Sequence, residues 1–114
     1  MNNDFKLIIL VKDYILSLED LLINIPNRDY YNKNAMRAYL DEILYLVYLI
    51  NNHRDKNIKI NLKYVLLSKV GMLNFYIERY HKLKYISKKQ VFYNAKTLEE
   101  ITKVIYGWIR SNDK

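Results

Sequence analysis

The segment Ser87–Trp108, SKKQVFYNAKTLEEITKVIYGW, carries the clearest folding signal in the chain. Ser87 precedes Gln90 by three residues, the spacing of a capping box, in which each side chain accepts a hydrogen bond from the other residue's backbone at a helix start. Apolar residues then follow with a helical heptad period. They are Val91, Leu98 and Ile105 at position a, and Ile101 and Trp108 at position d. The pattern predicts a helix over about residues 88–110, with Trp108 as a packing anchor.

The first half of the chain predicts two further helices, over about residues 4–24 and 34–52. The first carries two apolar rows that repeat every seven residues, and Pro26 closes it because proline cannot donate a backbone hydrogen bond. These rows are Ile8, Ile15, Leu22 and Val11, Leu18, Ile25. The second is apolar around nearly its whole circumference, with the heptad row Met36, Ile43, Ile50. Such a helix needs cover on several sides, from its own chain and from a second chain.

A third helix is predicted over about residues 60–84, from apolar residues spaced by three and four. They run Leu62, Leu66, Val70, Leu73, Ile77, Tyr80, Leu83. Gly71 interrupts this helix, and a close helix–helix crossing would explain a glycine there. Four helices joined by short linkers predict an all-α fold, an antiparallel up-down-up-down four-helix bundle that forms one domain over residues 1–114.

Composition narrows the functional class. The 114 residues include no cysteine, which excludes a disulfide framework and a cysteine-ligated zinc site and suits a cytoplasmic protein. The longest apolar run, Ile43–Ile50, is far shorter than the ~20 residues that span a bilayer. The amino-terminal segment does not have the pattern of a secretory signal. We therefore expect no membrane association. The 19 Lys and Arg against 12 Asp and Glu give a net charge of +7, which favours polyanionic partners.

Catalytic constellations are missing from the sequence. His53 and Asp55 resemble only half of a metal site, and Glu99 and Glu100 diverge by about 100° on one helix, so they do not form a carboxylate pair. No glycine-rich phosphate loop is present. We therefore expect no enzymatic activity, no metal and no cofactor.

Positive charge is organised along the fourth predicted helix. Lys89, Lys96, Lys103 and Arg110 recur every seven residues at position f, which faces directly away from the core. Lys88 joins them in the first turn, where the helix dipole disfavours cations. A cationic row of this kind predicts contacts with nucleic-acid phosphates, and the alternative interpretation is an ordinary solvated helix face.

Tyrosines and further basic residues extend this candidate nucleic-acid surface. Tyr93 and Tyr106 flank the cationic row, close enough to stack on bases. Arg28, Lys33 and Arg37, after the proline turn, are secondary candidates for basic contacts. Three lysines at the start of the third helix are expected to be ordinary surface charge. They are Lys56, Lys59 and Lys63.

Three segments resemble the accessory variability determinant proteins of diversity-generating retroelements, and the related four-helix proteins of ribosomal RNA intervening sequences. They are LKYISKKQ (Leu83–Gln90), LEEI (Leu98–Ile101) and YGWIRS (Tyr106–Ser111). The chain departs from that family in three places. This chain has Ile25-Pro26-Asn27 where the family has Phe-Pro-Lys, and Tyr106 where the family has a glycine. It has Asn74 and Glu78 where the family has arginines in the third helix.

The resemblance implies a small basic four-helix bundle that assembles into a homopentamer. It also implies binding of nucleic acid and association with a reverse transcriptase that copies template RNA into mutagenised cDNA. We therefore expect a non-enzymatic accessory protein of a retroelement whose partners are reverse transcriptase, RNA and DNA. The alternative hypothesis is a structural or protein-docking module whose positive charge is incidental.

Overall fold

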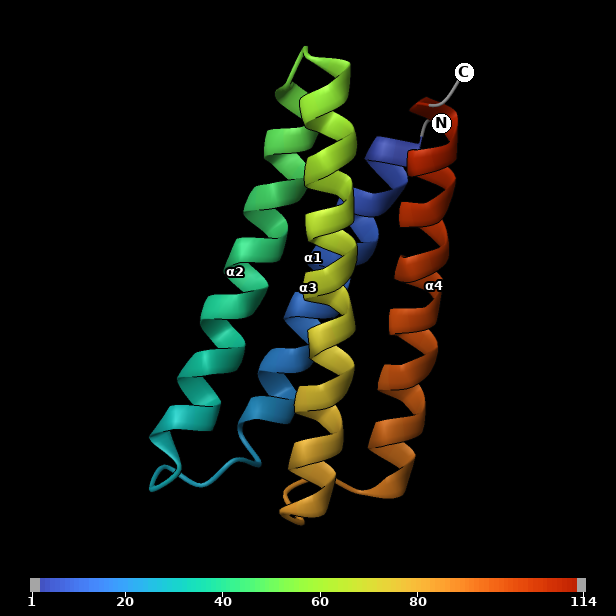
Figure 1. The fold of residues 1–114 in the computed structure, drawn as a ribbon. Helices are drawn as coiled ribbons and strands as arrows, with labels where there is room; N and C mark the ends of the chain where they lie inside the picture. The colour runs from blue at the N-terminus through green and yellow to red at the C-terminus, as the bar shows by residue number, and fades with distance from the viewer. Residues whose placement is uncertain (1–2, 113–114) are drawn as a thin grey trace.

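Four antiparallel helices make up the computed structural model, which describes residues 3–112. They are α1 (Asn3–Leu22), α2 (Tyr30–Asn52), α3 (Lys56–Lys82) and α4 (Lys88–Asn112). Consecutive helices pack against each other, and α4 closes the bundle against α1 (Figure 1). The bundle measures 46 × 23 × 20 Å. This confirms the predicted all-α four-helix bundle. None of the helices described has an apolar stretch long enough to cross a membrane.

Helices α2 and α3 begin four residues before their predicted starts because aspartates cap them. The Asp29 carboxylate accepts hydrogen bonds from the backbone and side-chain amides of Asn32. The Asp55 carboxylate accepts from the backbone N–H groups of Asn57 and Ile58, at 2.9 and 3.1 Å. Each cap satisfies N–H groups that have no partner within the helix, so it extends the helix past the last residue of the apolar pattern. Helix α1 ends at Leu22, four residues before Pro26.

The turn between α3 and α4 has a defined geometry. Lys84 adopts φ 64°, in the left-handed region, while the Tyr85 N–H donates to the Tyr80 carbonyl and the Lys84 N–H to the His81 carbonyl. This is the Schellman pattern of a helix end, although a lysine occupies the position that glycine favours. The predicted capping box of Ser87 and Gln90 follows, with hydrogen bonds of 2.8 and 3.2 Å in the two directions. The capping-box prediction is thereby confirmed.

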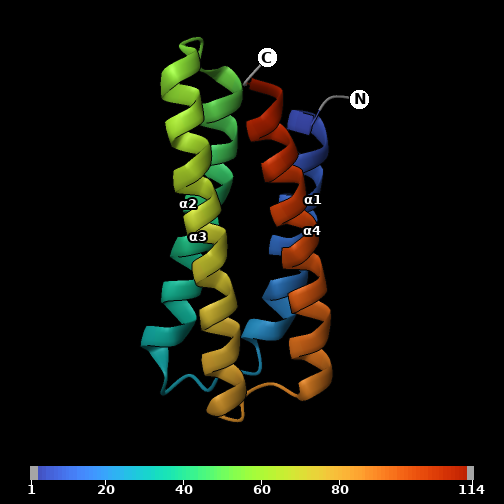
Figure 2. The same cartoon turned by 45° about the vertical axis from the view of Figure 1, so that its right-hand side comes forward.

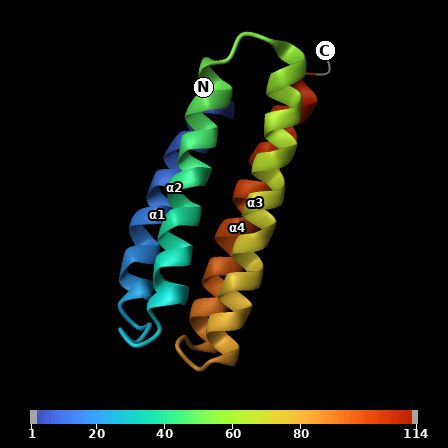
Figure 3. The same ribbon diagram turned by 60° about the vertical axis from the view of Figure 1, so that its left-hand side comes forward.

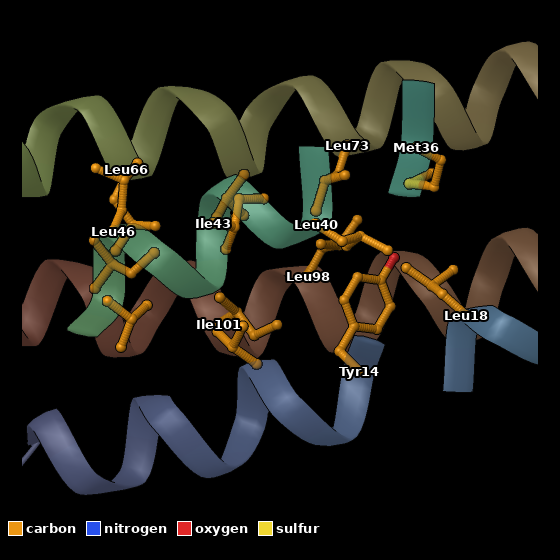
Figure 4. Packing of buried hydrophobic residues seen from close by; sticks show 14 of the residues in the cluster. Tyr14, Leu18, Met36, Leu40, Ile43, Leu46, Leu66, Leu73, Leu98 and Ile101 are labelled. Atoms are coloured by element: carbon orange, nitrogen blue, oxygen red, sulfur yellow. The ribbon is translucent and has the colours of Figure 1, made fainter. Parts of the chain in front are cut away.

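All four helices contribute apolar side chains to one core (Figure 4). In α1 the buried residues are shifted from the predicted rows. Tyr14 is buried whereas Ile8 and Ile15 are only partly so, and Ile15 lines a hollow between α1 and α2. In α3, Leu83 is 45% exposed and lies beyond the helix end. The crossing proposed at Gly71 is wrong, since Gly71 is exposed and no atom of another helix lies within 4 Å of where its Cβ would be.

Lys63 is fully buried, although the sequence pattern suggested surface charge. Its Nζ donates to the Trp108 carbonyl oxygen at 3.1 Å and lies 4.6 Å from the centre of the Trp108 ring. Near the carboxyl end of α4 the carbonyl groups favour a cation, and the indole face adds a cation–π attraction. Lys63 therefore joins α3 to α4, and Trp108, 3% exposed, is the packing anchor that the sequence predicted.

A hydrogen-bonded network fastens the α1–α2 turn to the α3–α4 turn, at the end of the bundle shown at the bottom of Figure 3. The Tyr85 hydroxyl donates to the Asp29 carboxylate at 2.6 Å, and the Tyr80 hydroxyl donates to the Asn32 carbonyl at 2.9 Å. The Arg79 guanidinium donates to the Asn32 side chain at 3.1 Å. The hydrogen bonds from Tyr85 and Asn32 hold the pKa of Asp29 below its usual value. We call this end the turn end.

Candidate nucleic-acid interface

The four predicted cations of α4 are all exposed along its outer side (α4 is orange to red in Figure 2). We call Lys89, Lys96, Lys103 and Arg110 the α4 stripe. At 1.5 Å per residue, successive members are about 10.5 Å apart and the stripe is about 31 Å long. One turn of a DNA duplex is about 34 Å long, so over the length of the stripe a duplex strand winds away from a straight row of cations, whereas a flexible single strand can follow it.

Acidic residues lie beside the middle of the stripe and weaken it there. The Lys103 ammonium is 3.2 Å from the Glu99 carboxylate, one helical turn away, and both side chains are largely exposed. Glu100 is exposed next to them. Such surface pairs are weak and screened by salt, but they lower the local positive potential. All four residues of the α4 stripe are positively charged, as the sequence shows. The helix surface around them carries both positive and negative side chains.

The amino-terminal half of α4 combines positive charge with exposed aromatic rings. Tyr93 is 58% and Phe92 56% exposed, and their ring centres are 6.1 Å apart in an edge-to-face arrangement. The Lys96 ammonium lies 4.6 Å from the centre of the Phe92 ring. Tyr106 is 45% exposed in the other half of the helix. Phe92 was missed, although a phenylalanine beside the cationic positions, outside a and d, is the signal that identifies it.

The α3–α4 turn adds lysines that sequence reasoning also missed. Lys82, at the end of α3, and Lys84, in the turn, are exposed a few residues before Lys88 and Lys89. The sequence His81–Lys89 shows four lysines in nine residues, which is the signal that could have found them. We define the turn–α4 patch as these lysines with the adjoining cation and rings of α4. Its members are Lys82, Lys84, Lys88, Lys89, Phe92, Tyr93 and Lys96.

A groove of about 340 Å³ between α1 and α4 borders the patch at Tyr93. Inside it, the Tyr14 hydroxyl donates to the Asn94 side-chain oxygen at 2.9 Å, and burial raises the pKa of Tyr14 far above its usual value. Tyr14 therefore remains a neutral hydrogen-bond donor. Asp20 of α1 also lines the groove and repels phosphate. The path open to a phosphate backbone thus follows the outer side of α4 rather than this groove.

The structure places the secondary basic candidates in two different regions of the bundle. Arg28 and Lys33 belong to the turn end, which also holds Lys88 and Lys89, and the Lys33 ammonium donates to the Asn27 side chain at 3.2 Å. Arg37 lies with Glu19 and Asp41 on the α1–α2 side. Since α2 and α4 are not neighbouring helices in the bundle, Arg37 is separate from the turn–α4 patch.

The residues weighed for metal binding have structural roles. The Asp55 backbone N–H donates to the His53 Nδ1 at 3.2 Å, while the Asp55 carboxylate caps α3. Within residues 3–112, no three His, Asp or Glu side chains gather closely enough to hold a metal ion. Glu99 and Glu100 are both exposed, and Glu99 pairs with Lys103.

Comparison with known proteins gives no relative to reason from: no family model, curated protein or solved structure matches this chain. The likeness to the accessory variability determinant proteins therefore rests on the sequence segments alone. Function has to be argued from the charge and the exposed rings of α4.

Proposed function

We propose that this protein binds nucleic acid as a non-enzymatic accessory subunit of a reverse transcriptase in a diversity-generating retroelement. The observation that carries the proposal is the turn–α4 patch, where five exposed lysines and two exposed aromatic rings lie close together in the sequence between Lys82 and Lys96. The resemblance of the chain to the retroelement proteins is the reason for proposing a reverse transcriptase as its partner. The protein would hold template RNA or cDNA close to the polymerase.

The chemistry of the patch favours strands with unpaired bases. Lysines neutralise phosphates without reading sequence, and the exposed rings of Phe92 and Tyr93 offer faces on which bases stack. Stacking needs a base that is free of its partner, as in RNA loops and single strands. We therefore expect tighter binding to structured RNA with loops, and to single strands, than to duplex DNA.

Salt dependence gives a quantitative test of this interface. Five lysines that each neutralise one phosphate give a slope of about −3.5 in log K against log salt on a single strand. Raising salt from about 50 to 200 mM then weakens binding roughly a hundredfold. Fluorescence anisotropy with a labelled RNA stem-loop, a single strand and a DNA duplex measures both the slope and the preference.

A charge-matched pair of variants tests the location of the site. Replacing the α4 stripe (Lys89, Lys96, Lys103 and Arg110) by glutamine removes four positive charges along α4, of which Lys89 and Lys96 belong to the turn–α4 patch. The control removes four charges elsewhere, with glutamine in place of Lys6, Arg54, Lys56 and Lys59. We expect the stripe variant to bind more weakly, with a flatter salt slope and unchanged helicity by circular dichroism. Equal loss in both variants would show that net charge alone drives binding.

A third variant tests the rings separately from the charge. Phe92→Leu with Tyr93→Leu leaves every lysine of the patch in place. We expect binding to single strands to fall about tenfold or more, since stacking contributes about 1–3 kcal/mol per base, while duplex binding changes little. An equal effect on both nucleic acids would remove stacking from the mechanism.

Association with the reverse transcriptase, and with further copies of this chain, forms the rest of the proposal. The resemblance implies five copies, and any multiple would raise affinity for a long RNA by repeating the patch. Co-expression with a retroelement reverse transcriptase, followed by purification in the presence of nuclease, tests the direct contact. Loss of the complex after nuclease treatment would show that RNA alone connects the two proteins.

Exposed tyrosines on α2 favour the second candidate function, docking to a protein. Tyr30, Tyr31 and Tyr45 are 72%, 74% and 65% exposed, a composition typical of contact surfaces. This candidate requires binding to a polypeptide that persists at high salt, together with weak, non-saturating binding to RNA. The anisotropy titration therefore decides between the two functions.

A further inference from the structure

The groove between α1 and α4 is lined by several polar side chains, and their hydrogen bonds determine what it can bind. The two helices lie side by side, and the groove between them has a volume of about 340 Å³ (Figure 2). This volume is within the usual range for a small-molecule site. A few polar groups in such a site fix the identity and the orientation of the ligand.

Three hydroxyl groups of the groove already donate their hydrogen within the protein. The Tyr14 hydroxyl donates to the Asn94 side-chain oxygen at 2.9 Å. The Ser17 hydroxyl donates to the Tyr14 carbonyl at 2.8 Å, and the Thr97 hydroxyl donates to a carbonyl one turn earlier in α4 at 3.2 Å. Because a hydroxyl has one hydrogen and two lone pairs, these three groups can only accept a hydrogen bond from a ligand.

The Asp20 carboxylate adds a negative charge and two more acceptors to the groove. Asp20 is exposed, and no hydrogen bond or ion pair joins its side chain to the rest of residues 3–112. An ionised carboxylate has two oxygens side by side, and both of them only accept. The groove therefore suits a ligand that presents two adjacent hydrogen-bond donors.

The position of the groove beside the turn–α4 patch indicates that this ligand is part of a nucleic acid strand. Tyr93 lines the groove and is also one of the exposed rings of the patch. Lys89 lies four residues before Tyr93 and Lys96 three residues after it, so all three share one face of α4. A strand whose base enters the groove can keep a flanking phosphate near each lysine. A basic protein side chain also carries adjacent donors, but these two lysines repel it.

We propose that the groove binds an unpaired guanine base, with the Watson–Crick edge of the base against the Asp20 carboxylate. On that edge guanine presents two adjacent donors, N1–H and the N2 amino group, which match the two carboxylate oxygens. Adenine and cytosine present an amino group beside a nitrogen lone pair, and uracil presents one N–H between two carbonyl groups, so each turns a lone pair toward Asp20. This inference rests on the proposed function, because the lysines of the patch hold the strand.

The capping box supplies a donor for the remaining group of the guanine edge. The Gln90 side-chain oxygen accepts from the Ser87 backbone N–H at 2.8 Å, and Gln90 also lines the groove. Since this hydrogen bond holds the oxygen, the amide N–H group of Gln90 can donate to a ligand. The guanine O6 atom, next to N1–H, is the acceptor that it meets.

Fluorescence anisotropy with the full-length protein tests the base preference. Labelled uridine strands of equal length carry guanosine, inosine, adenosine or uridine at the central position, and inosine differs from guanosine only by lacking the N2 amino group. We expect the guanosine strand to bind about tenfold more tightly than the adenosine and uridine strands, with the inosine strand between them. Equal, saturable binding of all four strands would overturn the guanine site and leave the proposed function standing. Absence of saturable binding to any strand would overturn both.

The variant Asp20→Asn tests the part of the site that selects guanine. Asparagine has nearly the same size, but it replaces one acceptor with a donor. We expect the preference for guanosine over uridine to fall below about twofold, with unchanged helicity and no loss of affinity for the uridine strand.

Asp13→Asn is the matched control for this variant. It makes the same change of charge at an exposed position of α1, seven residues earlier and outside the lining of the groove. We expect it to keep the guanosine preference. A preference that survives Asp20→Asn, or that both variants lose equally, would contradict the proposal.

Discussion

Replacing Gly71 by alanine should stabilise the protein. Gly71 lies in the middle of α3, is exposed, and has open space where a Cβ would be added. Alanine is about 0.8–1.0 kcal/mol better than glycine in a helix interior, because glycine loses more backbone entropy on folding. No steric cost opposes this gain, so we expect the free energy of unfolding to rise by about 1 kcal/mol.

Urea unfolding followed by circular dichroism measures the effect. With a typical slope of about 1–3 kcal/mol per molar urea, the midpoint should rise by roughly 0.3–1 M. The melting temperature should rise by about 4 °C. Ala38→Gly, at an exposed position of α2, is the control and should lower stability by a similar amount.

A destabilising effect of Gly71→Ala would refute the reasoning. It would mean that another surface closely approaches this face of α3 in solution, since nothing within the chain does so. Measurement at several protein concentrations then identifies contact with a second copy, because its effect grows with concentration.

Four further predictions concern the turns and the core. Lys84→Gly should stabilise by about 1 kcal/mol, measured by urea unfolding, because Lys84 has a left-handed φ of 64° that glycine adopts freely. Ser87→Ala should cost about 1 kcal/mol by losing the capping box, and a thermal melt that does not change would contradict this. Leu98→Ala should cost about 2–5 kcal/mol in the same melt, since Leu98 is fully buried. Asp29 has a lowered pKa, so its contribution to stability is complete above its usual value of about 3.9 and is lost as pH falls through the folded-state pKa. Asp29→Asn should therefore be less stable at neutral pH and flatten the loss of stability below about pH 4 in acid titrations.

Apolar periodicity predicted the four helices and most of the core, but it could not locate the polar details. The early starts of α2 and α3 depend on Asp29 and Asp55, which lie outside the apolar pattern. Tyr14 replaced Ile15 in the core because two neighbouring rows of α1 are both apolar, and only packing against α2 and α4 decides between them. The burial of Lys63 follows from its position beside Trp108, 45 residues away.

For the candidate site, heptad spacing predicted correctly that the α4 stripe lies on the exposed face of the helix. Spacing within one helix could not show that Glu99 pairs with Lys103, nor that Lys82 and Lys84 are exposed at the α3–α4 turn that leads to Lys88. These are features of side-chain conformation and of the turn. Binding of nucleic acid at this surface stays a prediction.

The environment of Trp108 gives the molecule a natural optical reporter. It is the one tryptophan of the chain, it is buried, and the Lys63 ammonium lies over its ring. Its emission wavelength therefore reports whether α3 and α4 remain in contact at this one point, while circular dichroism reports helix content along the whole chain. Coincidence of the two signals during unfolding would show that the bundle melts in one step. An earlier change in fluorescence would show that the α3–α4 contact opens while the helices persist.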